Sequence, residues 1–429
     1  MPAKTDISLP IKTNTKFYLS NHGLINTNYV PEMNKFDFDN EIDRRGSHSY
    51  KADKLKDIYG REDLIPLWVA DMDFKADDHI VQALREIVNF GVYGYNIEPP
   101  AFKSSIQNWI KNIQNWEIDR DWITFIPGVV RGIGYILHYF TLPGDKIIIQ
   151  PPVYHPFRLI SEDNKRVVIN NPLKINPQTA TGDSAGAVYS MDLEGLKEII
   201  REHDCKALIL CNPHNPGGIR WSREQLTELA DICYDNKILV ISDEIHADLQ
   251  LWDNKHTPFA TISDKARDIT ITLGAPSKSF NVPGLASSYY IIPNPTLREG
   301  FYKWLTHNEY NSPSIMASTV TIAAYTKADP WRRAVIKYIE QNILYIENFC
   351  RKHLPTIKVI RPDASYLIWL DCRKLGLTAS QLDDLFINRA HLALNNGKMF
   401  GSQGEGFMRL NVGSPRSIIE KAMNQLYNL

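Results

Sequence analysis

Short runs of consecutive apolar residues recur between residues 123 and 292, and stretches with helical periodicity separate them. Strands that alternate apolar and polar residues keep one face in water, whereas continuous apolar runs are typical of strands buried on both faces. Buried strands that alternate with helices form a mainly parallel sheet with helices on each side. The sequence therefore predicts an α/β fold, whose large domain holds a mainly parallel sheet built from residues 123–126, 146–150, 207–211, 238–242, 269–273 and 288–292.

Polar side chains stand within a few residues of the ends of these runs. They are Tyr154, Asn215, Asp243, His246 and Lys278. In open α/β sheets the carboxyl ends of parallel strands meet at one edge, and ligands bind there. We therefore expect these side chains to lie close together around a ligand.

A long helical pattern from Trp331 to Leu354 separates these runs from a shorter α/β segment, which ends in a helix that starts near Ser417. Residues 1–35 are polar, with single apolar residues scattered among them. The predicted organisation is an N-terminal arm at 1–35, the N-terminal part of a small domain at 36–96, a large domain at 97–333 and a small C-terminal domain at 334–429.

Charge and composition exclude several classes of protein. A formal net charge of −1 over 429 residues gives no reason to expect nucleic acid or an acidic membrane surface as a partner. No stretch approaches the 18 or so apolar residues of a membrane span, and the first 30 residues contain no apolar core of a signal peptide. The five cysteines are scattered without a CxxC pair, as in a cytoplasmic protein with reduced thiols.

Lys278 follows a β-branched run and stands between Ser277 and Ser279. A lysine at a strand end suits a Schiff base to an aldehyde cofactor, and the two serine hydroxyls could bind the phosphate of that cofactor. A solvated loop lysine is the alternative for Lys278 taken alone. The remaining parts of the same site, found elsewhere in the chain, favour the cofactor.

A second phosphate-binding element is predicted at residues 127–132. A strand, a glycine turn at Gly128 and the start of an apolar helix at Val129 and Val130 would offer free backbone N–H groups and a helix dipole. The glycines Gly132 and Gly134 are no dinucleotide fingerprint, because the third glycine is missing and both lie inside the helical pattern.

Asp243 ends a buried run, and a buried carboxylate needs a cation or hydrogen-bond donors. A protonated pyridine nitrogen would be such a cation. A metal cluster with Glu244, His246 and Asp248 is the competing interpretation, but residues 243 and 244 would point to opposite faces of a strand and no second histidine has ligand spacing. We therefore expect no metal, and we expect Glu244 to be paired within the structure.

Three further residues could contact the same ligand. Asn215 lies in a turn stiffened by two prolines and could donate to a phenolate or carboxylate oxygen, and Tyr154 could stack on an aromatic ring. Arg409 lies within an apolar strand and needs an anion, which a substrate α-carboxylate could supply through two hydrogen bonds. Ordinary loop positions for Asn215 and Tyr154, and a structural ion pair for Arg409, are the alternatives.

Several motifs together resemble the fold-type I pyridoxal-phosphate enzymes, and more narrowly the MalY/PatB-type cystathionine β-lyases of the class I/II aminotransferase superfamily. The resemblance runs from about residue 36 to the C-terminus and implies the fold-type I transferase fold. The motifs that carry it are 68–74 (WVADMDF), 91–95 (GVYGY), 212–216 (NPHNP), 242–246 (SDEIH), 277–281 (SKSFN) and 404–411 (GEGFMRLN).

The resemblance also implies a role for each matched residue. Lys278 would form the Schiff base with pyridoxal 5'-phosphate, and Asp243 would pair with the pyridine nitrogen. Arg409, Asn215 and Ala70 would contact the amino-acid substrate. Tyr95 would come from the neighbouring subunit of a homodimer and act in catalysis. The remaining cofactor contacts implied are Asn215 and His246 near the ring phenolate, Tyr154 stacked on the ring, Val129, Val130 and Ser277 at the phosphate, and Tyr95 from the neighbouring subunit.

The chain departs from the wider superfamily at two positions. Many aminotransferases have a tyrosine at the position of His246 and an arginine at the position of Ala286, eight residues after the lysine. Both differences fit the lyase branch. The missing arginine leaves open which groups bind the phosphate.

The activity implied by the resemblance is α,β-elimination of L-cystathionine or a related cysteine thioether to a thiol, pyruvate and ammonia, as a step of methionine biosynthesis. An aminotransferase would use the same residues but would require a keto-acid acceptor. A non-catalytic regulatory protein on the same fold is the alternative of another class, and the intact Lys278, Asp243 and Arg409 argue against it. A nicotinamide-dependent dehydrogenase is the least favoured alternative, because no GxGxxG follows a strand.

Overall fold

The computed structural model of the chain describes residues 17–20, 23–26, 35–176 and 188–429. These residues fall into two compact units, 1–37 and 38–429. In the first unit, β1 (Phe17–Ser20) pairs antiparallel with β2 (Gly23–Asn26). Most of the predicted arm at 1–35 lies outside the described residues, so its division from the rest of the chain stays a prediction.

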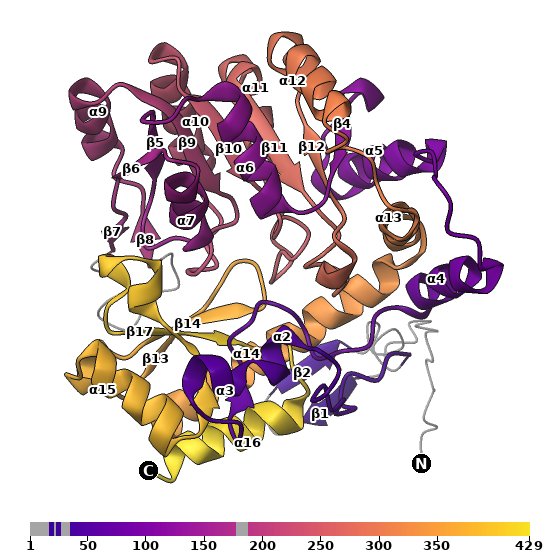
Figure 1. The fold of residues 1–429 in the computed structure, drawn as a ribbon. Coiled ribbons are helices and arrows are strands. Elements are labelled where there is room, and N and C mark those ends of the chain that lie inside the picture. Colours follow the sequence, from indigo (N-terminus) through magenta and orange to yellow (C-terminus); the bar gives the residue numbers. More distant parts are fainter. Residues whose placement is uncertain (1–16, 21–22, 27–34, 177–187) are drawn as a thin grey trace, which may run out of the picture. The chain divides into compact units, whose positions relative to one another are not determined.

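The second unit is built on a seven-stranded sheet (Figure 1). The strand order is β4-β12-β11-β10-β9-β5-β6. The five strands from β11 to β6 are parallel, while β12 is antiparallel to both of its neighbours. This confirms the predicted mainly parallel sheet. The strands are β4 (Ile123–Ile126), β5 (Lys146–Ile149), β6 (Val167–Asn170), β9 (Cys205–Cys211), β10 (Leu239–Asp243), β11 (Thr270–Gly274) and β12 (Ser288–Ile291).

Helices cover both faces of this sheet, which explains why the strands read as continuous apolar runs. Along β5, Ile147 and Ile149 belong to the core on one face and Ile148 to the core on the other. The first core is closed by α6 (Val129–Phe140), α7 (Pro156–Asp163) and α12 (Pro295–His307). The second is closed by α9 (Leu193–Glu202), α10 (Arg223–Asp235) and α11 (Asp264–Ile269).

Gly132 lets α6 approach the sheet closely. A Cβ atom at this position would lie 2.5 Å from Cδ1 of Ile126 on β4 and 3.0 Å from Cδ2 of Leu273 on β11. The tight contact fixes the start of α6 beside the carboxyl ends of the strands. Gly132 is thus a packing residue within a helix, as the sequence predicted.

A second sheet of four antiparallel strands follows the long helix α14 (Asp329–His353). Its order is β13 (Lys358–Ile360), β14 (Leu367–Asp371), β17 (Phe407–Asn411) and β16 (Asn395–Asn396). The longer helical stretches that follow α14 are α15 (Ala379–Asp383), a π-helical turn at Asp384–Arg389 and the last helix α16 (Arg416–Tyr427).

Residues before 97 also pair with the C-terminal part of the chain, in a separate two-stranded sheet. The short strand β3 (Ile65–Pro66) pairs parallel with β15 (Leu392–Ala393), although more than 300 residues separate them in sequence. The predicted division of the chain at 96/97 and 333/334 stays a prediction. The other helices are α2 (Tyr50–Asp53), α3 (Leu55–Tyr59), α4 (Asp78–Phe90), α5 (Pro100–Gln114) and α13 (Ile315–Lys327).

The five cysteines are all buried and none forms a disulfide bond. Within the described parts of the chain, no helix combines the length and the hydrophobicity that a membrane span requires.

Candidate active site

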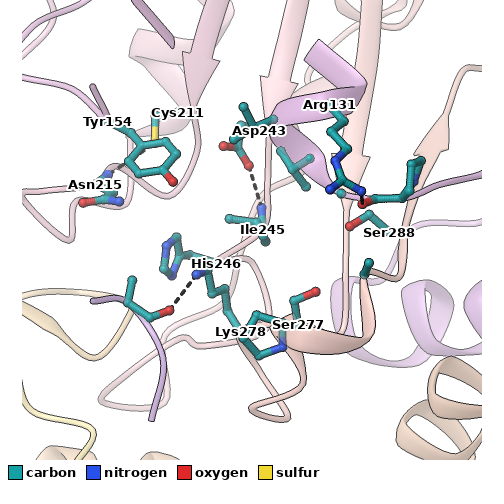
Figure 2. A pocket seen from close by; sticks show the side chains of 17 residues that line it. Arg131, Tyr154, Cys211, Asn215, Asp243, Ile245, His246, Ser277, Lys278 and Ser288 are labelled. Atoms are coloured by element: carbon teal, nitrogen blue, oxygen red, sulfur yellow. Dashed lines mark hydrogen bonds between the residues drawn. The ribbon is translucent and has the colours of Figure 1, made fainter. Parts of the chain in front are cut away.

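A cavity of about 300 Å³ lies at the carboxyl ends of the parallel strands (Figure 2). Parallel pairing puts Asp243, the last residue of β10, opposite Cys211 of β9 and Leu273 of β11. The expected convergence of the strand-end residues on one site is therefore observed. The predicted site residues that line this cavity are Ala70, Val129, Val130, Tyr154, Asn215, Asp243, His246, Ser277 and Lys278.

Lys278 lies in the turn that follows β11. Its Nζ donates a 2.6 Å hydrogen bond to the carbonyl oxygen of Ala70. Burial lowers the pKa of Lys278 to about 8, with a further lowering by Arg409, while Asp71 and Asp243 oppose the change. A lysine with a pKa near 8 has a sizeable fraction of neutral amine at neutral pH, and the neutral amine is the nucleophile and the base.

Asp243 is 4% exposed and has no cation within ion-pair distance among the described residues. Its Oδ1 accepts a 3.1 Å hydrogen bond from the backbone N–H of Ile245. Burial raises the pKa of Asp243 to about 7, and this hydrogen bond and the charge of Lys278 only partly offset it. A buried carboxylate of this kind is stabilised by a cation placed in the cavity beside it.

The N-terminus of α6 borders the cavity. Gly128 precedes the helix with φ at 138°, a conformation that favours glycine, and no side chain caps the helix start. The first N–H groups of a helix have no partner within the helix, so those at Val129 and Val130 can bind an anion. Ser277 also lines the cavity, whereas Ser279 does not: its side chain is buried, and Oγ has no hydrogen-bond partner in the described structure. Of the two serines predicted to bind the phosphate, only Ser277 lines the cavity, and its contact with a phosphate stays a prediction.

Asn215, His246 and Tyr154 share one side of the cavity. Burial lowers the pKa of His246 to about 3, assisted by Lys278 and Arg409, so the imidazole is neutral. Its Nδ1 is buried and has no partner among the residues described. A buried, unpaired polar atom is costly and is satisfied by a ligand or water that enters the cavity.

Arg409, on β17 of the second sheet, does not line the cavity itself but contacts Asn215, which does. Its Nη1 donates to Oδ1 of Asn215 at 3.0 Å, and its Nη2 donates to Oδ1 of Asn395 at 2.6 Å and to the carbonyl of Trp68 at 2.9 Å. All three partners are neutral, and Nε has none in the described part of the chain. Burial lowers the pKa of Arg409 to about 10. The alternative of a structural ion pair is therefore not observed, and the guanidinium can take a carboxylate.

Tyr95 does not line the cavity, and its side chain is fully exposed in the single chain. It stands in the segment between α4 and α5, where Val92, Tyr93 and Ile97 are also exposed. Its expected place in the site of a neighbouring subunit stays a prediction.

Glu244 and Asp248 have partners of their own outside the cavity. Oε2 of Glu244 lies 2.7 Å from Nε2 of His256, and its Oε1 accepts from Ser242 and from the backbone N–H of Phe259. Asp248 accepts hydrogen bonds from Trp109 and Gln114. The prediction that Glu244 is paired within the structure is confirmed.

Sequence reasoning missed Arg131, Cys211 and Ser288, which also line the cavity. Arg131 lies in the first turn of α6 and forms no ion pair with any described residue; its Nη1 contacts only the carbonyl of Pro127 at 3.4 Å (Figure 2). It brings a positive charge to the cavity, which Ala286 also lines in place of the arginine common in the superfamily. Its position just after the glycine turn is the signal that could have identified it.

The arrangement fits pyridoxal phosphate. Asp243 offers an unpaired carboxylate for the pyridine nitrogen, Lys278 an amine for the aldehyde, and the start of α6 free N–H groups for the phosphate. The unpaired Nδ1 of His246 leaves one polar group for a ring substituent.

Comparison with known proteins also indicates a pyridoxal-phosphate enzyme. The model of the family "Aminotransferase class I and II" matches residues 62–426. Cystathionine beta-lyase PatB of Bacillus subtilis is 40% identical over 389 residues, which is 91% of this chain and 98% of the relative. Protein MalY of Escherichia coli is 32% identical, covering 92% of this chain and 98% of that protein.

A solved structure shows the same fold. The crystal structure of cystalysin from Treponema denticola, which contains a pyridoxal 5'-phosphate cofactor, matches with a TM-score of 0.85 and 31% identity, covering 92% of this chain and 98% of that one. The predicted fold-type I architecture and the resemblance to MalY/PatB-type enzymes are confirmed. The chain belongs to the aminotransferase class I and II family.

Proposed function

We propose that this protein is a pyridoxal-phosphate-dependent carbon–sulfur β-lyase that acts on cysteine thioethers, with L-cystathionine as the first candidate. The observation that carries the proposal is the placement of Lys278, Asp243 and the start of α6 around one cavity, in a chain 40% identical to a cystathionine β-lyase. Around one cavity, the amine suits an aldehyde, the buried carboxylate suits a ring nitrogen and the anion site suits a phosphate. Pyridoxal phosphate carries all three groups.

Pyridoxal phosphate, when bound, supplies an electron sink that accepts the electron pair left at Cα of an amino acid and so allows the Cβ–S bond to break. Asp243 keeps the ring nitrogen protonated because its buried carboxylate needs that cation. His246 and Asn215, which line the same cavity, would donate to the ring oxygen, and Tyr154 would offer an aromatic face to the ring.

Arg409 binds the α-carboxylate of the substrate, since its guanidinium has only neutral partners in the described structure. This contact fixes the amino acid so that Cα faces Lys278. The neutral amine of Lys278 then removes the proton from Cα, and a general base in this position contributes ~10²–10⁴-fold to the rate. A thioether RS–CH₂–CH(NH₃⁺)–COO⁻ and water give RSH, pyruvate and ammonium, so cystathionine gives homocysteine, a precursor in methionine biosynthesis.

We also infer that the enzyme is a homodimer in which Tyr95 enters the site of the partner. The support is the exposed apolar stretch around Tyr95, which includes Phe90, Val92, Tyr93 and Ile97. Large exposed apolar patches mark interfaces more often than free surface. The catalytic role of Tyr95 rests on the resemblance alone.

The test follows free thiol and pyruvate together after L-cystathionine is added to purified holoenzyme without any keto acid. Equal release of both products, absent in a Lys278→Ala variant, is the expected result. Turnover that starts only when a keto acid is added would establish the aminotransferase alternative on the same residues. Protein that binds no pyridoxal phosphate, seen as no absorbance band of the bound cofactor, would contradict the proposal and leave a regulatory role.

A further inference from the structure

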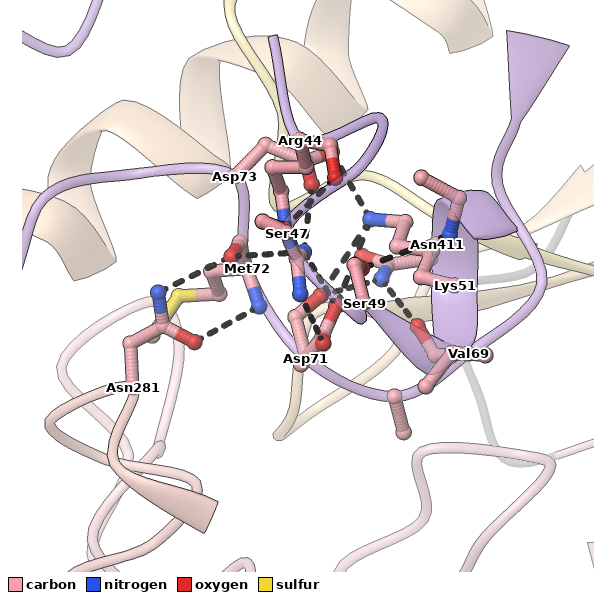
Figure 3. Close-up of polar contacts among 12 residues, drawn as sticks. Arg44, Ser47, Ser49, Lys51, Val69, Asp71, Met72, Asp73, Asn281 and Asn411 are labelled. Atoms are coloured by element: carbon pink, nitrogen blue, oxygen red, sulfur yellow. Dashed lines mark hydrogen bonds and ion pairs between the residues drawn. The ribbon is translucent and has the colours of Figure 1, made fainter. Parts of the chain in front are cut away.

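Residues 69–74, referred to below as segment 69–74, form an irregular stretch between β3 and α4 (Figure 3). The segment passes beside the lysine turn, since the carbonyl of Ala70 accepts the hydrogen bond from Nζ of Lys278. One backbone hydrogen bond, from the N–H of Asp73 to the carbonyl of Gly413 at 2.8 Å, ties it to the C-terminal part of the chain. Side chains from three other parts of the chain also hold it.

Asn281 holds the segment from the side of the lysine turn. Its Oδ1 accepts a 2.9 Å hydrogen bond from the N–H of Met72, and its Nδ2 donates to the carbonyls of Met72 and Phe74 at 2.9 and 2.8 Å. Asn281 stands three residues after Lys278 and has φ at 56°, in the left-handed region that asparagine tolerates. One side chain therefore satisfies three backbone groups of the segment.

Two further groups hold the segment from the opposite side. Nδ2 of Asn411, on β17, donates to the carbonyls of Val69 and Asp71 at 2.6 Å each. Arg44 binds the carboxylates of Asp71 and Asp73, and the fully buried Lys51 lies 2.7 Å from Oδ2 of Asp73. These contacts are part of the network in Figure 3.

The carbonyl of Ala70 is the point where this network reaches the cavity. It accepts from Nζ of Lys278 at 2.6 Å and from the hydroxyl of Tyr366 at 2.8 Å. A carbonyl that accepts one hydrogen of the lysine amine fixes the direction of the nitrogen lone pair. Ala70 can do this only if the segment is held still relative to the lysine turn, and Asn281 is the residue that ties the two together.

We propose that Asn281 is a positioning residue: it binds segment 69–74 so that the Ala70 carbonyl holds the free ε-amine of Lys278 in one orientation. The inference rests on the proposed function in one respect: it takes Lys278 to act as the base that removes the proton from Cα. The hydrogen bonds themselves belong to the free amine and do not depend on which reaction follows.

The test compares wild-type protein with Asn281→Gly, because glycine adopts the left-handed conformation freely and the change removes only the side-chain contacts. Asn281→Asp is the second variant, since it keeps the acceptor for Met72 but loses both donors. Asn171→Ser is the matched control: Asn171 is also buried and uses its side chain in two hydrogen bonds, with Gln150 and with the carbonyl of Asp192, away from segment 69–74.

The first readout is the pH dependence of carbamylation of Lys278 by cyanate in cofactor-free full-length protein, followed by peptide mass spectrometry. Cyanate reacts with the neutral amine, so the profile gives the pKa of Lys278. The Ala70 carbonyl accepts a hydrogen bond from the amine and the nearby Asp71 raises its pKa, so we expect Asn281→Gly to lower this pKa by roughly one pH unit. In Asn281→Asp the new carboxylate opposes that fall, so the shift should be smaller. The second readout is the steady-state kinetics of the holoenzyme, where kcat should fall about 10-fold while KM changes less than about 3-fold.

Asn171→Ser also loses buried side-chain hydrogen bonds but should leave the cyanate profile of Lys278 unchanged. A profile in both Asn281 variants that superimposes on wild type, or an equal change in Asn171→Ser, would overturn the inference. A changed cyanate profile in a protein without lyase activity would support Asn281 and count only against the proposed function.

Discussion

Nη1 of Arg409 donates a 3.0 Å hydrogen bond to Oδ1 of Asn215, although 194 positions of sequence separate the two residues. Arg409 lies on β17 of the four-stranded sheet, and Asn215 lies in the turn that follows β9 of the seven-stranded sheet. The bond therefore joins the two sheets at the cavity. It also orients a buried guanidinium whose partners in the described structure are all neutral, which leaves its charge for a substrate.

Arg409→Lys tests that use of the charge. Lysine keeps the positive charge but cannot bind a carboxylate with two parallel hydrogen bonds. A hydrogen bond to a charged group contributes about 1.5–3 kcal/mol, so kcat/KM for a cysteine thioether should fall about 10- to 100-fold. The control substrate is the same thioether with its α-carboxylate converted to an amide, on which wild type and variant should be equally slow. A fall of the same size on the amide would show that Arg409 acts on the fold and not on the carboxylate.

The site residues at the strand ends were predictable because each polar side chain directly follows, or lies close after, a run of apolar residues. Asp243 follows a run of buried residues, and a carboxylate at such a position has few explanations other than a cationic partner. Lys278 and Tyr154 also follow apolar runs that are long enough to read as strands. Parallel pairing then brings these positions together without any further information from the sequence.

The contacts that complete the site were not predictable, because they join residues far apart in sequence. The bonds from Asn281 to Met72 span 209 positions and those from Asn411 to Asp71 span 340. No periodicity marks an asparagine that binds backbone groups of a distant segment. The edge strand β6 escaped prediction for a different reason: its residues are half-buried or exposed, so it lacks the continuous apolar run of its neighbours.

Asp243→Asn should change how the stability of the cofactor-free protein depends on pH. The native pKa of Asp243 is about 7 and its ordinary value is 3.8, so between these values the native state holds a proton that the unfolded state has lost. The stability that this proton provides is complete below about pH 4 and is lost as the pH rises toward 7. The free energy of unfolding of wild type should therefore fall relative to Asp243→Asn by roughly 1.4 kcal/mol for each pH unit in that window.

Urea denaturation of both cofactor-free proteins at pH 5 and at pH 7.5 measures this effect. Lys278, whose pKa the charge of Asp243 raises, is the group expected to titrate differently in the two proteins. A difference in free energy between the proteins that is the same at both pH values would contradict the raised pKa. Addition of pyridoxal phosphate should stabilise wild type more than Asp243→Asn at pH 7.5, because only the carboxylate pairs with a protonated ring nitrogen.

Arg131→Ala should weaken the binding of a phosphate group and nothing else. The guanidinium lines the cavity at the start of α6 and has no ion-pair partner in the described residues. Loss of one charge-assisted contact at a partly exposed position corresponds to a Kd for pyridoxal phosphate about 10-fold higher. The Kd for pyridoxal, which lacks the phosphate, should not change, and Arg131→Lys should recover part of the loss. Equal weakening for both ligands would assign Arg131 to the shape of the cavity.

Tyr95 allows a test of the homodimer by subunit complementation. If Tyr95 serves the site of the partner subunit, Tyr95→Ala and Lys278→Ala are each inactive alone. A mixed dimer then has one site with both defects and one site with neither, so it is half active. The purified mixed dimer should therefore approach about half of wild-type activity, and an unfractionated random mixture about a quarter. The measurement is lyase activity after the two variants are co-expressed with different affinity tags and the mixed dimer is purified. Mixed dimers without activity would place Tyr95 in the site of its own subunit, and a Tyr95→Ala protein that is active alone would place it outside both sites.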